Sequence, residues 1–298
     1  MLVSQKNQFS HIINHNKPDE VFNETKKIFS YHYSEESFLT IEYVYKMMRY
    51  LYNGSFPGYR ACNTDYHDFN HMNHVFLAVV RIIDGLNISL KPLNETKAVN
   101  LMIASMLHDA GYIQEDSDTE GTGAKYTTTH EYRSIEFTKK NYKMLNLSIE
   151  NIPAISSYIE STSLTSDSID NLFGQDFLCA AILATADIIG QMSDRLYLEK
   201  LLFLYYEFVE AGIDGYNTAF DILRKTHTFY ESTMNRLDEK FHAFYDMAKY
   251  HFKERYSIDE NLYMTAIENQ INYLKNIIDD TNSNFRDKLH RLNIQEKN

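Results

Sequence analysis

The sequence predicts an all-α protein, a compact bundle of many helices. Only 10 glycines and 4 prolines occur among 298 residues, so residues that break helices are scarce. Apolar residues recur three and four positions apart through long segments, which is the helical period. A hydrophobic share of 44% is enough for a sizeable core. We therefore expect one helical domain over 1–298, with its core at about 36–278 between a polar lead-in and a polar tail.

The first half of the chain contains four expected helices. A short amphipathic helix is expected at 19–32. Ser34-Glu-Glu-Ser is typical of a helix start, and the apolar stripe after it predicts a helix at 36–52, which Asn53-Gly54 ends. A third helix is expected to open at Tyr66 and to continue to about residue 83. A buried fourth follows at about 95–109.

The second half contains seven more expected helices. They lie at about 130–145, 149–162, 176–194, 196–211, 216–235, 238–255 and 259–278. The tail, 279–298, is polar and either frays or packs as a last short helix. Between the two halves, the polar stretch 115–129 contains Gly121-Thr-Gly123. A phosphate-binding P-loop would need a strand before these glycines and Lys-Ser/Thr after them, so we interpret the stretch as a surface loop.

Composition narrows the classes of function and the cell compartment. The net charge of −12 argues against general binding to a nucleic-acid backbone, although not against a nucleotide held by metal ions. Two cysteines, Cys62 and Cys179, are too few for a disulfide framework. The N-terminus has no apolar signal segment, and no apolar run approaches the roughly 20 residues of a membrane-spanning helix. We expect a cytoplasmic protein without a membrane partner, and its oligomeric state stays open.

The pair His108-Asp109 stands at the end of the apolar segment that begins at Leu101. An adjacent imidazole and carboxylate supply the nitrogen and oxygen ligands that a divalent metal uses. The alternative is an ordinary helix end, where His108 interacts favourably with the helix dipole and Asp109 faces water.

Three histidines precede this pair in Tyr66-His-Asp-Phe-Asn-His-Met-Asn-His74. His67 and His71 are four apart and His74 is three further on, so one helical face would carry all three. A single histidine on an apolar face is usually a core residue, but three together predict a metal or catalytic site. His130, in a first helical turn after Thr127-Thr-Thr, is either a further ligand or an exposed histidine.

Asp187 ends a run of small and apolar residues that starts at Phe177. A carboxylate in such a helix is costly unless a partner, such as a metal, compensates it. The alternative is a hydrogen-bonded or exposed aspartate. Asp194, seven residues on, could share its face, and Arg195 could reach a phosphate or form a surface pair.

The ordered set His71, His108-Asp109 and Asp187 resembles the HD phosphohydrolase superfamily of all-helical, metal-dependent phosphoesterases. The resemblance covers at least 60–195. Tyr66-His67-Asp68-Phe69-Asn70-His71 is also similar to the Tyr-His-Asn-x-x-His motif of class I cyclic-nucleotide phosphodiesterases, with Asp68 in place of Asn. Ala186-Asp187 precedes Glu207-Phe208-Val209, as a similar pair precedes Glu-Phe-Phe in that family. Gln270 and Tyr273 faintly resemble its purine-binding Gln and Phe.

The chain also departs from that family. Asp109-Ala-Gly-Tyr112 lacks the histidine that follows His-Asp there, which leaves open how a bridging water would be oriented. The stretch from Asp109 to Asp187 is also short in comparison with that family. His130 is instead similar to the histidine that holds a second metal in bacterial HD domains.

The resemblance implies a mechanism and a set of site residues. His71, His108, Asp109 and Asp187 would bind one divalent ion (Zn, Mg, Mn or Fe), and Asp109 and His130 would hold a second. Water on the metal would lose its proton near neutral pH and attack phosphorus. His67 is the candidate general acid, with Asp68 or Glu131 holding its other nitrogen. Candidates for substrate binding are Gln270, Tyr273, Arg195 and His74.

Four functions follow from these observations. The first is a phosphodiesterase for a cyclic nucleotide or a similar small phosphate ester. The second is an HD-type nucleotide phosphomonoesterase. The third is a non-catalytic metal- or nucleotide-binding signalling module, and the fourth is an iron oxygenase with His74 and His130 as additional ligands.

Overall fold

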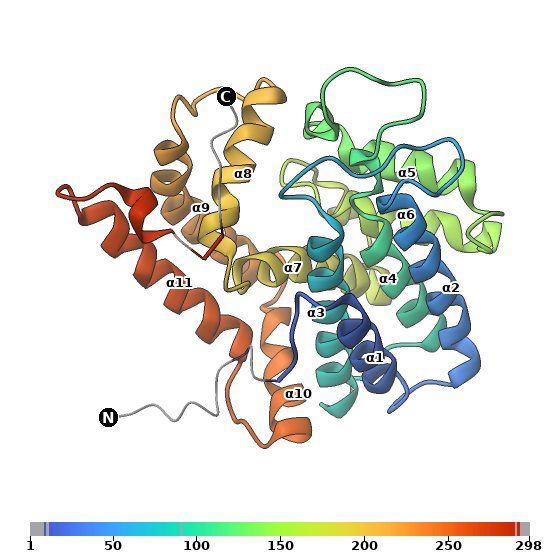
Figure 1. Ribbon diagram of the computed structural model, residues 1–298. Coiled ribbons are helices and arrows are strands. Elements are labelled where there is room, and N and C mark those ends of the chain that lie inside the picture. Colours follow the sequence, from blue (N-terminus) through green and yellow to red (C-terminus); the bar gives the residue numbers. More distant parts are fainter. Residues whose placement is uncertain (1–8, 10–11, 90, 290, 293–298) are drawn as a thin grey trace.

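The computed structural model describes residues 9, 12–89, 91–289 and 291–292. It confirms the all-α prediction: the described part contains eleven α-helices, several short 3-10 helices and no strand (Figure 1). The α-helices are α1 Pro18–Phe29, α2 Glu35–Tyr52, α3 Phe69–Ile88, α4 Glu95–Leu107, α5 His130–Asn141, α6 Ile152–Glu160, α7 Gly174–Met192, α8 Tyr197–Glu210, α9 Ala219–Glu239, α10 Met247–Tyr256 and α11 Leu262–Asp279.

Each expected helix is present, but several begin later than the sequence pattern predicted, and the largest shift is that of α10, which begins at Met247 rather than 238. The third begins at Phe69 rather than Tyr66, because the Asp68 carboxylate accepts the main-chain N–H of His71 and caps the helix there. The ninth begins at Ala219 rather than 216, after a capping box formed by Thr218 and Asp221. In the tail, a short 3-10 helix covers Phe285–Lys288.

Helix α3 lies at the centre of the fold. Almost all of its side chains are buried, because α1, α4, α7 and α10 pack around it. Two glycines permit the closest approaches. A side chain at Gly85 would collide with the main chain of Met247 on α10, and Gly190 of α7 lies against the main chain of His74. In Figure 1, α7 runs from the group of α8, α9 and α11 toward the group of α2 to α6.

Buried apolar side chains form one cluster that includes residues from Ile13 to Leu289. The assignment of a single domain stays a prediction. Among the described residues, no single helix is long and apolar enough to cross a membrane. Helices α7 and α8 reach that length and apolarity only as a pair, and a bend of 110° separates them.

A buried carboxylate connects α3 to α10 and to the segment after α1. The Asp84 side chain is fully buried and accepts bonds from His251 at 2.7 Å, His32 at 2.7 Å and the Arg255 guanidinium at 2.8 Å. These three partners hold the pKa of Asp84 well below its usual range despite burial. Burial lowers the pKa of His251 to about 4, against the pull of Asp84. His251 is therefore neutral at pH 7 and donates from Nδ1.

This depressed pKa predicts acid sensitivity. A histidine whose pKa is lowered on folding stabilises the fold above its unfolded pKa of about 6.5, and this contribution is lost as pH falls toward 4. Between pH 7 and pH 5 the loss from His251 amounts to about 2 kcal/mol. In His251→Asn the amide still donates to Asp84 but cannot be protonated. Urea unfolding at pH 7 and at pH 5 gives the free energy of unfolding of each protein. Between these pH values the variant should lose about 2 kcal/mol less than the wild type. An equal drop would contradict the assignment, and His227→Asn on exposed α9 is the control.

Candidate metal centre

Three helices bring the four predicted ligands together. His71 lies in the first turn of α3, His108 and Asp109 follow the last turn of α4, and Asp187 lies on α7. Because α3 packs against both α4 and α7, residues up to 116 positions apart meet at one point. His71, His108 and Asp109 are buried, whereas the Asp187 side chain remains 18% exposed. The centre is thus accessible from the side of Asp187.

Nitrogen and oxygen atoms face one another at short distances in this centre. His71 Nε2 lies 3.1 Å from Asp109 Oδ2, 3.2 Å from Asp187 Oδ1 and 3.4 Å from His108 Nε2. His108 Nε2 lies 3.3 Å and 3.6 Å from the same two oxygens. Ligands about 2.0–2.2 Å from a tetrahedral metal ion are roughly 3.3–3.6 Å apart, so the spacing suits such an ion.

The hydrogen bonds around these nitrogen and oxygen atoms also favour a cation between them. His108 Nδ1 donates to the Ser105 main-chain oxygen at 2.9 Å, so the ring in its neutral form would present its Nε2 lone pair to two carboxylate oxygens. Asp109 Oδ2 is buried without a hydrogen-bond partner. Lone pairs that face one another repel, and a proton or a metal ion between them removes the repulsion. His71, His108 and Asp187 therefore place three ligand atoms close enough for one metal ion, and Asp109 Oδ2 lies beside both imidazoles.

The pKa values of these four residues reflect the same interactions between imidazoles and carboxylates. Burial alone would lower the pKa of His71, but Asp109 and Asp187 outweigh it and raise the pKa to about 9. The same carboxylates raise the pKa of His108 well above its usual value. Against the effect of burial, the two imidazoles lower the pKa of both aspartates. The cluster thus attracts positive charge strongly.

His130 lies on the other side of Asp109. Its Nε2 is 3.6 Å from Asp109 Oδ1, the oxygen that does not face His71, and its Nδ1 donates to the Thr127 main-chain oxygen at 2.7 Å. Gly111 makes this possible, because a side chain there would collide with the main-chain oxygen of His130. Asp109 therefore directs one carboxylate oxygen toward His71 and His108 and the other toward His130.

His67 lies beside the centre but not on α3, because it precedes the Asp68 cap. The expectation that His67, His71 and His74 share one helical face was wrong for His67 for this reason. Its Nδ1 donates to Glu207 Oε2 on α8 at 2.6 Å, and Glu207 Oε1 accepts the main-chain N–H of Tyr66 at 2.7 Å. The expected partners were also wrong: Asp68 caps α3, and Glu131 lies 3.3 Å from His130 Nδ1.

Tyr112 packs against both His67 and His130. Its ring stacks on His67 with 4.2 Å between centroids and on His130 with 4.6 Å. The Tyr112 hydroxyl is 3.4 Å from His67 Nε2. In this chain Tyr112 follows His108-Asp109 where the phosphodiesterase motif has a histidine. Tyr112 and Glu207 are the neighbours of His67 to which the sequence alone assigned no role.

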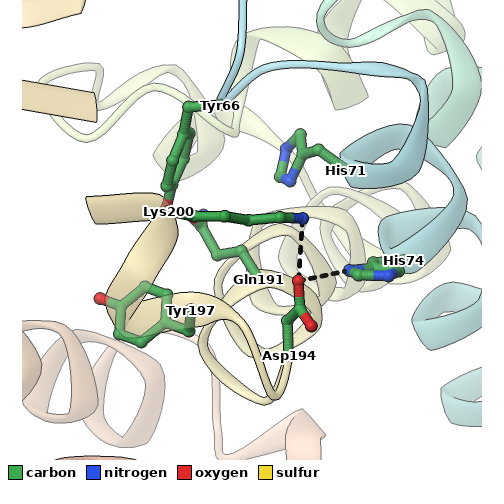
Figure 2. A pocket seen from close by; sticks show the side chains of 7 residues that line it. All are labelled: Tyr66, His71, His74, Gln191, Asp194, Tyr197 and Lys200. Carbon is green, nitrogen blue, oxygen red and sulfur yellow. Dashed lines mark hydrogen bonds and ion pairs between the residues drawn. The ribbon is translucent and has the colours of Figure 1, made fainter. Parts of the chain in front are cut away.

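A small polar pocket adjoins the centre, with His71 in its wall (Figure 2). It encloses about 220 Å³ of empty space, its open mouth included, and is lined by Tyr66, His71, His74, Gln191, Asp194, Tyr197 and Lys200. His74 is directed at Asp194, with 3.8 Å between Nδ1 and Oδ2, rather than at the four ligands. Burial lowers the pKa of His74 to about 4.

The three other predicted substrate contacts lie elsewhere. The Arg195 side chain is exposed, and its main-chain oxygen accepts a bond from Arg291. Gln270 is buried and donates to the main-chain oxygen of Asp194 at 2.7 Å. Tyr273 donates to the main-chain oxygen of Lys288 at 3.0 Å. The structure gives none of the three a contact with the four ligands.

Fold and site together define an all-α protein with a buried cluster of two histidines and two aspartates that suits a divalent ion. A family model described as Npun_R2479-like matches residues 116–268, slightly more than half of the chain, and the chain belongs to this family. The match contains His130, Asp187 and Glu207, whereas His67, His71, His108 and Asp109 precede it. No curated protein and no solved structure matches the chain.

The geometry predicts that metal content depends on Asp187. Changes next to a ligand typically lower metal affinity about 10–100-fold, so Asp187→Ala, which removes a direct ligand, should lower it by more than about 100-fold. Elemental analysis after dialysis should find bound metal in the wild type and little in the variant. Asp176→Ala is the matched control, since Asp176 lies on the same helix but pairs with Lys97. Full metal content in Asp187→Ala would remove Asp187 from the centre.

Proposed function

We propose that this protein is a metal-dependent phosphohydrolase related to the HD superfamily, and that it acts as a phosphodiesterase on a cyclic nucleotide or a similar small phosphate ester. The observation that carries the proposal is the convergence of His71, His108, Asp109 and Asp187 from three helices, with the His67–Glu207 pair beside them. The cofactor would be one or two divalent ions of Zn, Mg, Mn or Fe.

Each residue has a distinct task in this proposal. The two imidazoles and two carboxylates would hold the first ion, and Asp109 with His130 would hold the second. A bound divalent ion would supply water with a pKa near 7 and would neutralise charge on the phosphate. A phosphate ester fits this centre because its anionic oxygens need the positive charge that the cluster gathers.

His67 supplies the proton that an alkoxide leaving group requires. Glu207 accepts from Nδ1, which fixes the ring and compensates the charge of the imidazolium, so Nε2 is the nitrogen that can donate. The Tyr112 ring on one face of His67 restricts its rotation. Because His67 lies outside the four-ligand cluster, it can act without leaving a metal.

A nucleotide phosphomonoesterase is the second candidate. The pocket beside the centre carries the cationic side chain of Lys200. An ammonium group in this position suits a phosphoryl group. An iron oxygenase is not proposed, because it needed His74 as an additional ligand and His74 faces Asp194. The complete set of ligands disfavours a non-catalytic module.

The test of this proposal compares leaving groups. In His67→Ala, hydrolysis of an ester with an alkoxide leaving group should fall about 10²–10⁴-fold, the usual contribution of general acid catalysis. Hydrolysis of a nitrophenyl ester should fall far less, because nitrophenolate leaves without a proton. Glu207→Gln should show the same pattern in weaker form, and His227→Ala should show neither effect.

Three results would contradict the account. An equal loss on both esters with metal retained would make His67 a positioning residue. Loss of the metal from His67→Ala would make it a ligand. If a panel of phosphodiesters and phosphomonoesters shows no hydrolysis by the metal-loaded wild type, the proposed function itself is wrong.

A further inference from the structure

The pocket in Figure 2 contains a lysine that the chemistry at His67 and the metal ligands does not use. Lys200 lies in the first turn of α8, and its side chain is 13% exposed. Its Nζ lies 2.8 Å from Asp194 Oδ2. In Figure 2 the side chain extends across the pocket, and the ammonium ends on the side of His71 and Asp194. A buried ammonium is costly, so its position next to a metal ligand requires a reason.

The register of α8 shows that Lys200 faces the reaction centre. Lys200 and Glu207 are seven residues apart, which is two helical turns, so they project from the same face. Glu207 contacts His67. One face of α8 therefore presents a carboxylate to the candidate general acid and an ammonium to the pocket beside His71.

The ammonium retains its charge and part of its bonding capacity. Burial alone would lower the pKa of Lys200, but Asp194 and Asp68 outweigh it and raise the pKa. The neighbouring His74 is neutral at pH 7, so Asp194 is the counter-ion within the pocket lining. An ammonium has three N–H groups, and the ion pair with Asp194 at 2.8 Å engages at most one of them. The others are available to an acceptor in the pocket.

We propose that this pocket binds a phosphoryl group, with Lys200 as a direct ligand to its oxygens and Asp194 as the counter-ion that holds the ammonium in place. The chemical class of the ligand is thus a tetrahedral oxyanion. The proposal deepens the proposed function, since the same phosphoryl group would meet the metal ions. It explains why a costly buried lysine stands next to the centre.

In a competing explanation, Lys200 only neutralises the charge of Asp194 and binds no ligand. The two accounts predict different results for the single Asp194 variant and for the double variant. If Lys200 binds phosphate, Asp194→Asn removes a repelling carboxylate and frees the ammonium, so phosphate should bind more tightly. If Lys200 is only a counter-ion, removal of both charged groups should restore wild-type behaviour.

The test measures the affinity of the full chain for inorganic phosphate by titration calorimetry in the presence of Mn²⁺. Lys200→Met should weaken binding about 10–100-fold, the usual effect of losing a hydrogen bond to a charged group. Lys200→Arg should retain most of the affinity, and Asp194→Asn should bind at least about 3-fold more tightly. The double variant should remain as weak as Lys200→Met. Lys97→Met, which breaks a Lys–Asp pair outside the pocket, is the matched control.

Unchanged affinity in Lys200→Met, or a double variant that matches the wild type, would overturn the proposal. If Lys200→Met does not fold, Asp194→Asn decides, because unchanged or weaker binding there overturns it as well. The readout is independent of turnover. A chain that binds phosphate through Lys200 but hydrolyses no ester would refute the proposed function alone, and a hydrolase indifferent to Lys200 would refute this inference alone.

Discussion

The structure depends on the burial of two carboxylates against two imidazoles. Asp109 and Asp187 lie next to His71 and His108 at a point where α3, α4 and α7 meet. Uncompensated charges there would cost several kcal/mol each, so the helices can pack this closely only if a cation, proton or metal, is shared among the four groups. The same shared cation is therefore required both for the packing of the three helices and for the chemistry of the centre.

Helix α8 supplies the second part of the arrangement. It follows α7 after a bend of 110°, which directs one face of α8 toward His67 and the pocket. Glu207 and Lys200 on that face add an anion and a cation to a centre that α3, α4 and α7 have already formed. One more turn along, Glu210 accepts hydrogen bonds from Thr122, which ties α8 to the loop before His130.

Sequence patterns predicted the helices, and they also singled out the four candidate ligands that the structure brings together, because both leave local signals. Apolar periodicity sets a helix, and His-Asp or a lone Asp in an apolar run is conspicuous. The details that the sequence did not reveal depend on tertiary contacts. The partner of His67 is 140 residues away, so Asp68 and Glu131 were proposed from proximity in sequence alone. His67 lies before α3 because Asp68 caps that helix, and no sequence pattern shows that His74 faces Asp194.

The most direct measurement is anomalous X-ray scattering from crystals of the protein as purified, recorded at the Mn, Fe and Zn absorption edges. The account predicts an ion within about 2.0–2.2 Å of Nε2 of His71, Nε2 of His108 and carboxylate oxygens of Asp109 and Asp187. Four side chains bonded only to one another, with no ion even after soaking in metal, would show a structural ion-pair cluster and contradict the central claim.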